Sequence, residues 1–140
     1  MILYLDTSAL VKLFIDEIGS RQIRDAVAAS DGLASSLISY TEARSAFARK
    51  HRLGEISQAD YQQYKQEFER YWPAINQLII AVATVRRAAD LCELYALRAY
   101  DGVQLASAES LQSSVATRVT FASFDEALNK GASALGMSTL

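Results

Sequence analysis

Short apolar runs recur along the chain, and longer segments with helical spacing separate them. Runs bounded by polar or small residues predict strands at residues 2–5, 33–34, 78–82 and 119–122. Residues 137–140 predict a short edge strand after a turn at Gly136. Because strands alternate with helices, the pattern favours an α/β fold with a central parallel sheet of four to five short strands.

The helical segments include a predicted hairpin of two helices at residues 39–53 and 57–72. A break at residues 53–56 separates the pair, and Pro73 ends the second helix. We interpret this pair as an insertion packed beside the sheet. The second helix carries aromatic residues at helical spacing, which favours a core-facing stripe, with a share of the face available to another chain. The predicted helices span residues 8–15, 20–29, 39–53, 57–72, 84–99, 102–112 and 126–134.

The composition is typical of one soluble domain over residues 1–140. The 14 basic and 16 acidic side chains give a formal charge of -2, which is not the basic balance of a passive nucleic-acid binder. The single cysteine, Cys92, excludes an internal disulfide and a cysteine-rich zinc site. The only histidine, His51, lies in a polar stretch and receives no role. No apolar run is long enough to span a membrane and no signal peptide is evident, so we expect a cytoplasmic protein.

Four carboxylates follow apolar runs or begin predicted helices: Asp6, Glu42, Asp101 and Asp125. Asp6 and Asp125 come directly or shortly after predicted strands, and ligands gather at such strand ends in open α/β sheets. If the four converge, each ionised pair at about 4 Å repels by roughly 4 kcal/mol at an effective dielectric near 20. Protonation with a raised pKa, or a bound divalent cation, would relieve that repulsion.

Each carboxylate also has a structural interpretation when taken alone, because acidic side chains cap helix N-termini. Residues 39–42 and 123–126 both read as capping boxes, and Asp6 and Asp101 precede predicted helices. Taken together, the four acids favour a shared site. The nearby hydroxyls of Thr7, Ser8 and Ser123 add the hard oxygen ligands that Mg²⁺ or Mn²⁺ prefers, and this disfavours zinc.

In order and context, the acids resemble those of the PIN-domain ribonucleases, in particular toxins of the VapC type. The matching segments are residues 3–10 (LYLDTSAL), 39–46 (SYTEARSA), 97–108 (LRAYDGVQLASA) and 121–128 (FASFDEAL). The resemblance covers almost the full length. One departure is Gly102, where the family more often has alanine, a change expected to loosen the helix start beside Asp101.

The resemblance implies a PIN-like three-layer α/β/α fold and a metal-dependent endoribonuclease that cleaves single-stranded regions of RNA. Asp6, Glu42, Asp101 and Asp125 would be catalytic and would hold one or two Mg²⁺ or Mn²⁺ ions, directly or through water. Among the basic residues of the predicted helix 39–53, Arg44 is the expected phosphate contact, with Thr7, Ser8 and Ser123 as further substrate-binding residues. The resemblance also implies a homodimer and a cognate antitoxin protein in a toxin-antitoxin system.

A non-catalytic PIN-like module that binds RNA or a protein is the alternative from another class. The complete acidic set argues against it, because clustered negative charge near phosphates gives a pure binder no advantage. A phosphotransfer receiver or a haloacid-dehalogenase-type phosphatase also places an aspartate after the first strand. The phosphatase pattern needs a second aspartate where this chain has Ser8, and the receiver needs an acidic pair and a late lysine that Lys130 does not match.

Overall fold

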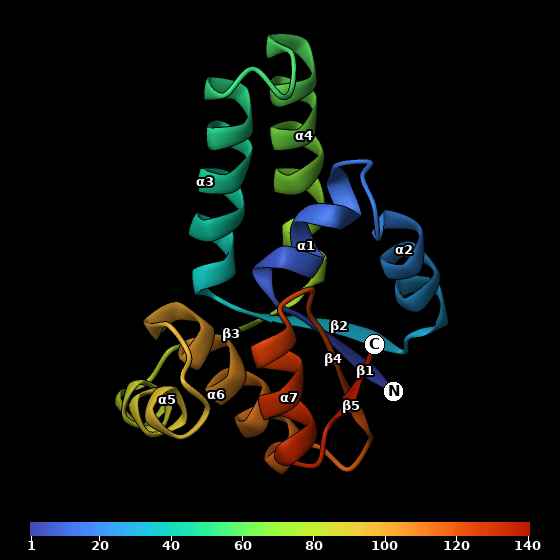
Figure 1. Cartoon of the computed structure of the whole chain (residues 1–140). Coiled ribbons are helices and arrows are strands. Elements are labelled where there is room, and N and C mark those ends of the chain that lie inside the picture. Colours follow the sequence, from blue (N-terminus) through green and yellow to red (C-terminus); the bar gives the residue numbers. More distant parts are fainter.

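The computed structural model describes residues 1–140 as one five-stranded parallel sheet between two layers of helices (Figure 1). The strand order is β3-β2-β1-β4-β5, and every neighbouring pair is parallel. This confirms the predicted α/β class, with its three layers and helical hairpin. The strands are β1 (Ile2–Leu5), β2 (Gly32–Ser36), β3 (Asn76–Leu78), β4 (Val119–Ala122) and β5 (Ser138–Thr139). The helices are α1 (Thr7–Phe14), α2 (Ser20–Ala29), α3 (Ile38–Arg52), α4 (Gln58–Tyr71), the short 3₁₀ helix η1 (Trp72–Ala74), α5 (Val82–Tyr95), α6 (Ala99–Ser114) and α7 (Glu126–Ala134).

The side chains of β1 divide the core into two halves, because successive residues of a strand point to opposite faces. Leu3 and Leu5 pack with buried residues of α1 to α4, whereas Tyr4 packs with those of α5 to α7. Tyr4 also stacks on Phe121 of the neighbouring strand β4, with ring centroids 5.4 Å apart. The sheet therefore has helices on both faces, as a buried parallel sheet requires.

The hairpin of α3 and α4 extends beyond the sheet, next to α1 (Figure 1). Its packing is aromatic: Phe68 is fully buried and makes edge contacts with Phe14 and Phe47. Trp72 is also buried, whereas Tyr71 is 36% exposed. The predicted core-facing stripe is thus confirmed for most of its length. His51 stacks on Tyr61 with ring centroids 4.9 Å apart, so it packs within the hairpin.

Two predicted boundaries are wrong in the segment between the hairpin and α6. The strand expected at residues 78–82 is β3, Asn76–Leu78, and Val82 already begins α5. An apolar run that crosses from a strand into a helix cannot be divided by periodicity alone. The single helix expected at residues 84–99 ends at Tyr95, because Ala96 adopts a left-handed conformation (φ 54°). A separate helix, α6, then begins at Ala99 rather than Gly102.

Gly102 lies inside α6, at the contact with α5, and this contact leaves no room for a side chain. A Cβ at this position would lie 2.3 Å from Cys92 Sγ and 2.8 Å from the Ala88 carbonyl oxygen. The expected loosening of a helix start is therefore wrong. Gly102 instead permits the close approach of α5 and α6.

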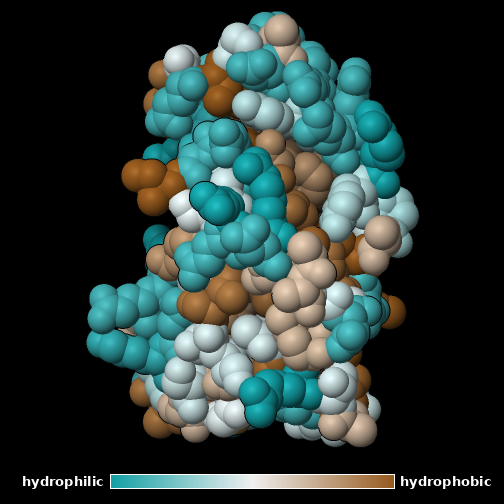
Figure 2. Space-filling model, turned by 90° about the vertical axis from the view of Figure 1, so that its right-hand side faces the viewer, coloured by the Kyte–Doolittle hydropathy of each residue, from teal (hydrophilic) through white to brown (hydrophobic).

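The surface carries both hydrophilic and hydrophobic residues. Figure 2 shows the side of the molecule on which α2 and both termini lie, where hydrophilic residues cover much of the face and hydrophobic residues reach the surface between them. None of the helices is both long and apolar enough to cross a membrane.

Candidate active site

Asp6 lies at the carboxyl end of β1, in the middle of the sheet. Its backbone N–H donates to the Ala122 carbonyl at the end of β4 (3.1 Å). Its Oδ1 accepts hydrogen bonds from the Ala9 N–H (2.9 Å) and the Ser8 hydroxyl (2.7 Å). Asp6 is therefore the N-cap of α1, as expected. Its side chain is restricted by these hydrogen bonds and by burial, since the residue is only 3% exposed.

Asp125 occupies the corresponding position after β4. Its Oδ1 accepts from the Leu128 N–H (3.0 Å) and caps α7, and its own N–H donates to Ser123 Oγ (2.9 Å). The Ser8 hydroxyl oxygen also accepts from the Phe124 N–H (2.9 Å), which ties the two loops together. Strands β2 and β3 lie on one side of β1 in the sheet, and the chain then crosses to form β4 on the other side of β1. This is the kind of switch point at which open α/β sheets bind ligands.

Glu42 approaches the same place from α3. Its Oε1 accepts a hydrogen bond from the Thr7 hydroxyl (2.8 Å) and another from Gln104 Nε2 (3.0 Å). The capping box expected at residues 39–42 is absent, because α3 already begins at Ile38 and Ser39 forms buried side-chain hydrogen bonds instead. Glu42 is thus held by tertiary contacts.

Asp101 is the third residue of α6 and does not cap it, contrary to expectation. Its Oδ2 lies 3.5 Å from Arg98 Nε, and the Arg98 side chain is 89% exposed. In the first turn of the helix the carboxylate is favoured by the helix dipole.

All four carboxylates line one open cleft of about 570 Å³. They surround the cleft, however, and no group of three histidine, cysteine or acidic side chains is close enough to hold one ion together. The expected tight convergence is therefore corrected to a wider arrangement. The cleft is lined by Asp6, Thr7, Ser8, Val11, Lys12, Glu17, Glu42, Ala46, Arg49, Arg98, Asp101, Gln104, Phe124 and Asp125.

The carboxylates affect one another electrostatically. Burial raises the pKa of Asp6 to about 6, and the charge of Asp101 adds to this rise. Ser123, Ser8 and the Ala9 backbone N–H act in the opposite direction and lower the pKa. Burial also raises the pKa of Asp101, the charges of Asp125 and Glu42 raise it further, and the neighbouring Arg98 lowers it. Burial, together with the neighbouring like charges, therefore makes the ionised forms of Asp6 and Asp101 less favourable, and a divalent cation bound in the cleft would offset this.

The donor set fits a hard divalent cation. The cleft offers carboxylate and hydroxyl oxygens as ligands, and no cysteine or histidine lines it. Mg²⁺ keeps several of its waters and needs only one or two protein carboxylates as direct ligands. The spacing around this cleft is compatible with such binding, in which further carboxylates act through water.

Two of the predicted substrate-binding residues lie outside the cleft lining. Arg44 forms an ion pair with Glu69 of α4, and its Nη1 also lies 3.1 Å from the Tyr40 hydroxyl oxygen, so it joins the two helices of the hairpin. Ser123 is buried and its hydroxyl oxygen accepts from the Asp125 N–H. Thr7 and Ser8, by contrast, do line the cleft.

Sequence reasoning did not select five polar residues that line the cleft: Lys12, Glu17, Arg49, Arg98 and Gln104. Two of them, Arg49 and Arg98, lie at a helical spacing from one of the acids, and this spacing could have predicted their position. Arg49 lies seven residues, or about two helical turns, after Glu42. Arg98 lies three residues before Asp101. For Gln104 no local signal exists, because its partners come from distant segments.

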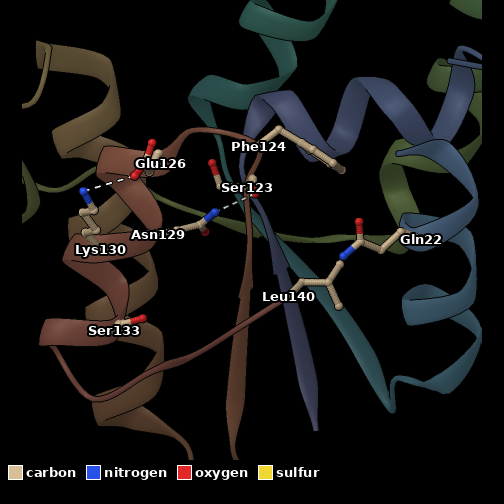
Figure 3. A pocket seen from close by; sticks show the side chains of 8 residues that line it. All are labelled: Gln22, Ser123, Phe124, Glu126, Asn129, Lys130, Ser133 and Leu140. Atoms are coloured by element: carbon tan, nitrogen blue, oxygen red, sulfur yellow. Dashed lines mark hydrogen bonds and ion pairs between the residues drawn. The ribbon is translucent and has the colours of Figure 1, made fainter. Parts of the chain in front are cut away.

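A second hollow of similar size lies beside the loop of Phe124 and is drawn in Figure 3. Glu126, its only carboxylate, pairs with Lys130 (3.2 Å), and Asn129 Nδ2 donates to the Ser123 carbonyl (2.9 Å). Volume does not distinguish the two cavities, but chemistry does. Only the cleft between the four carboxylates offers several acidic oxygens.

Comparisons with known proteins agree with this architecture. The family profile of the PIN domain matches residues 3–132. The chain is 30% identical over 135 residues to Ribonuclease VapC45 of Mycobacterium tuberculosis, and this alignment covers 96% of this chain and 92% of that protein. FitAcB from Neisseria gonorrhoeae superimposes with a TM-score of 0.70 at 17% identity, covering 100% of this chain and 96% of that one. A toxin-antitoxin complex from Klebsiella pneumoniae gives a TM-score of 0.63 at 20% identity, covering 93% and 89%. At these identities the solved structures show a shared fold.

Proposed function

The chain belongs to the PIN domain family, and we propose that it is a Mg²⁺- or Mn²⁺-dependent endoribonuclease that hydrolyses phosphodiester bonds in single-stranded regions of RNA. Its relative VapC45 is named a ribonuclease, which supports the reaction class. The observation that carries the proposal is the lining of one cleft by Asp6, Glu42, Asp101 and Asp125 at the carboxyl ends of β1 and β4.

The four carboxylates would bind the cations, some directly and some through water. A bound Mg²⁺ or Mn²⁺ supplies an activated water and neutralises charge on the phosphate oxygens. Asp6 is fixed by its cap hydrogen bonds and Glu42 by Thr7, so these two donors keep their positions before any ion arrives. The side chains of Arg49 and Arg98 at the same cleft would bind the phosphates of the RNA strand.

We further propose that the protein is the toxin of a toxin-antitoxin pair and forms a homodimer. The solved toxin-antitoxin complex from Klebsiella pneumoniae shares its fold, which supports an antitoxin partner. A toxin of this class would arrest growth when it is expressed alone, and Asp6→Asn would remove the effect.

The reaction is tested with purified protein and defined single-stranded and double-stranded RNAs, in Mg²⁺, in Mn²⁺ and in EDTA, with mapping of the cut ends. We expect cleavage of the single strands only when a divalent cation is present. Asp6→Asn and Asp101→Asn should abolish cleavage while circular dichroism shows folded protein. Asp25→Asn is the matched control, because Asp25 is exposed on α2 and pairs only weakly with Arg21 at 3.9 Å.

Two results would contradict the proposal. One is cleavage by the Asp6→Asn and Asp101→Asn proteins at the rate of the parent. The other is RNA binding by the parent without any cleavage in either cation, which would favour a non-catalytic PIN-like module.

A further inference from the structure

The amide of Gln104 is the centre of a buried polar network beneath the acidic cleft. Gln104 is only 2% exposed, although its residue type is usually found at the surface. Its Nε2 lies within hydrogen-bonding distance of Glu42 Oε1 (3.0 Å), Ser39 Oγ (2.8 Å) and Thr7 Oγ1 (3.1 Å). One side chain from α6 thus contacts both α1 and α3.

Tyr4 and Glu42 together set which way this amide points. The buried Tyr4 hydroxyl donates to Gln104 Oε1 (2.7 Å), so the carbonyl faces Tyr4 and the NH₂ faces Glu42. The reverse orientation would place the amide oxygen against the Glu42 carboxylate, where two acceptors repel. The Tyr4 phenol carries one proton, and this proton lies between its oxygen and the amide oxygen of Gln104.

The network leaves Glu42 with one oxygen for the cleft. Glu42 Oε1 accepts from both Thr7 and Gln104, whereas Oε2 has no hydrogen-bond donor from the protein. A carboxylate fixed in this way can offer Oε2 to a cation or to one of its waters.

The same network reaches the backbone next to Asp6. The Ser35 hydroxyl donates to the Leu5 carbonyl (2.7 Å), and since it has a single proton, Ser39 must donate to Ser35 Oγ (2.7 Å). Leu5 is the residue directly before Asp6. The positions of Glu42 and of the strand end that carries Asp6 are therefore linked through a chain of hydrogen bonds.

We propose that Gln104 is a positioning residue of the active site, which holds Glu42 so that Oε2 is presented to the divalent cation. This rests on the proposed function, since it assumes that the cleft binds Mg²⁺ or Mn²⁺. Gln104 acts through Glu42 and does not touch the cation or the RNA. Neither the motifs nor the spacing of the acids indicates this role.

The test is a double-mutant cycle on Mn²⁺ affinity, measured by titration calorimetry without RNA. The proteins are the parent, Glu42→Gln, Gln104→Met and the double variant. Methionine keeps the length of glutamine but cannot donate to Glu42. We expect Gln104→Met to weaken Mn²⁺ binding by about 10-fold or more, the effect typical of residues that orient metal ligands. In the Glu42→Gln background the same change should have no further effect, because the carboxylate it positions is already gone.

Two more variants separate positioning from general stability. Gln112→Met removes a glutamine from the same helix, whose Oε1 accepts from the Val119 N–H (3.0 Å) far from the acids, so it should lower the melting temperature without changing Mn²⁺ affinity. Tyr4→Phe removes only the hydroxyl that orients the Gln104 amide, and should weaken Mn²⁺ binding less than Gln104→Met does. It also supplies the measurement if Gln104→Met does not fold.

The outcomes distinguish this inference from the function on which it rests. If the parent binds Mn²⁺ and Glu42→Gln weakens that binding, but Gln104→Met and Tyr4→Phe keep the parent affinity, Gln104 has no positioning role and the proposed function stands. Equal losses from Gln104→Met in both backgrounds would likewise overturn the inference, since they would show an effect independent of Glu42. A parent protein that binds no Mn²⁺ and cuts no RNA would contradict both the positioning role of Gln104 and the proposed function.

Discussion

Asp6→Asn should stabilise the metal-free protein at neutral pH even though it removes activity. Asp6 is 3% exposed at the end of β1, and burial raises its pKa from 3.8 to about 6. Above pH 6 the folded protein must therefore hold a buried negative charge close to Asp101. Asparagine keeps an oxygen that accepts from Ser8 and Ala9 and is an equally good helix N-cap, but it carries no charge.

The sign of the pH effect is opposite to that of a salt-bridged carboxylate. Between pH 3.8 and about 6 the folded protein binds more protons at Asp6 than the unfolded chain, so its stability falls as the pH rises through this window. The difference between 3.8 and about 6 is 2.2 units, which at 1.36 kcal/mol per unit amounts to about 3 kcal/mol. Loss of the favourable charge at the N-terminus of α1 offsets about 0.3–1 kcal/mol of this gain. The net stabilisation expected at pH 7.5 is about 2–3 kcal/mol.

Urea unfolding in EDTA at pH 3.5, 5 and 7.5 measures this difference, with Asp25→Asn as the matched exposed control. The stability gained by Asp6→Asn over the parent should be small at pH 3.5 and largest at pH 7.5. Saturating Mn²⁺ should then stabilise the parent, by about 2.7 kcal/mol at 100 times its Kd, and stabilise the variant much less. A variant that is no more stable than the parent at pH 7.5, with the same dependence on pH, would refute the electrostatic account of the cleft.

Two further predictions follow from the packing of α5 against α6 and from the two arginines of α3. Gly102→Ala should lower the free energy of unfolding by about 1–2 kcal/mol. The added Cβ would meet the Ala88 carbonyl oxygen at 2.8 Å, so the overpacking cost should reach about 2–3 kcal/mol, of which alanine regains about 1 kcal/mol through helix propensity. Adding Cys92→Ala to this variant should restore part of the lost stability, because Cys92 Sγ is the atom nearest to the added Cβ. Urea unfolding measures both variants, and a Gly102→Ala protein as stable as the parent would contradict the close approach of α5 and α6. Arg49→Ala should raise KM for RNA about 10-fold, in line with a charged hydrogen bond worth about 1.5 kcal/mol, whereas Arg44→Ala should leave KM unchanged because Arg44 pairs with Glu69. Steady-state cleavage kinetics measure both, and the reverse order would show that Arg44 contacts RNA.

The sequence by itself determined the elements whose pattern is local. The strands at residues 2–5 and 119–122 and the helices at residues 20–29 and 126–134 have the predicted bounds. The two strands are short apolar runs and the two helices repeat apolar residues at helical spacing, and both signals act within a few residues of chain. The family resemblance also rested on short segments around the acids, and the match of the PIN profile to residues 3–132 agrees with it.

The prediction that Asp6 and Asp125 leave the same edge of the sheet needed only the rule that parallel strands end together. Where the sequence offered two interpretations, helix capping or membership of a shared cleft, the structure shows that they are not exclusive. Both residues cap their helices through Oδ1 and line the cleft as well. Glu42 and Asp101 cap nothing.

Only the tertiary structure decided the spacing of the acids, the partner of Arg44 and the hydrogen-bond partners of the Gln104 amide. Arg44 and Arg49 lie on the same helix, and which of them faces the acids depends on how α3 packs against α4 and α1. Gln104 meets Tyr4 across 100 residues of sequence and Glu42 across 62. Periodicity records which face of an element is apolar, but distances between side chains from different elements depend on how the layers pack, and no local pattern encodes that packing.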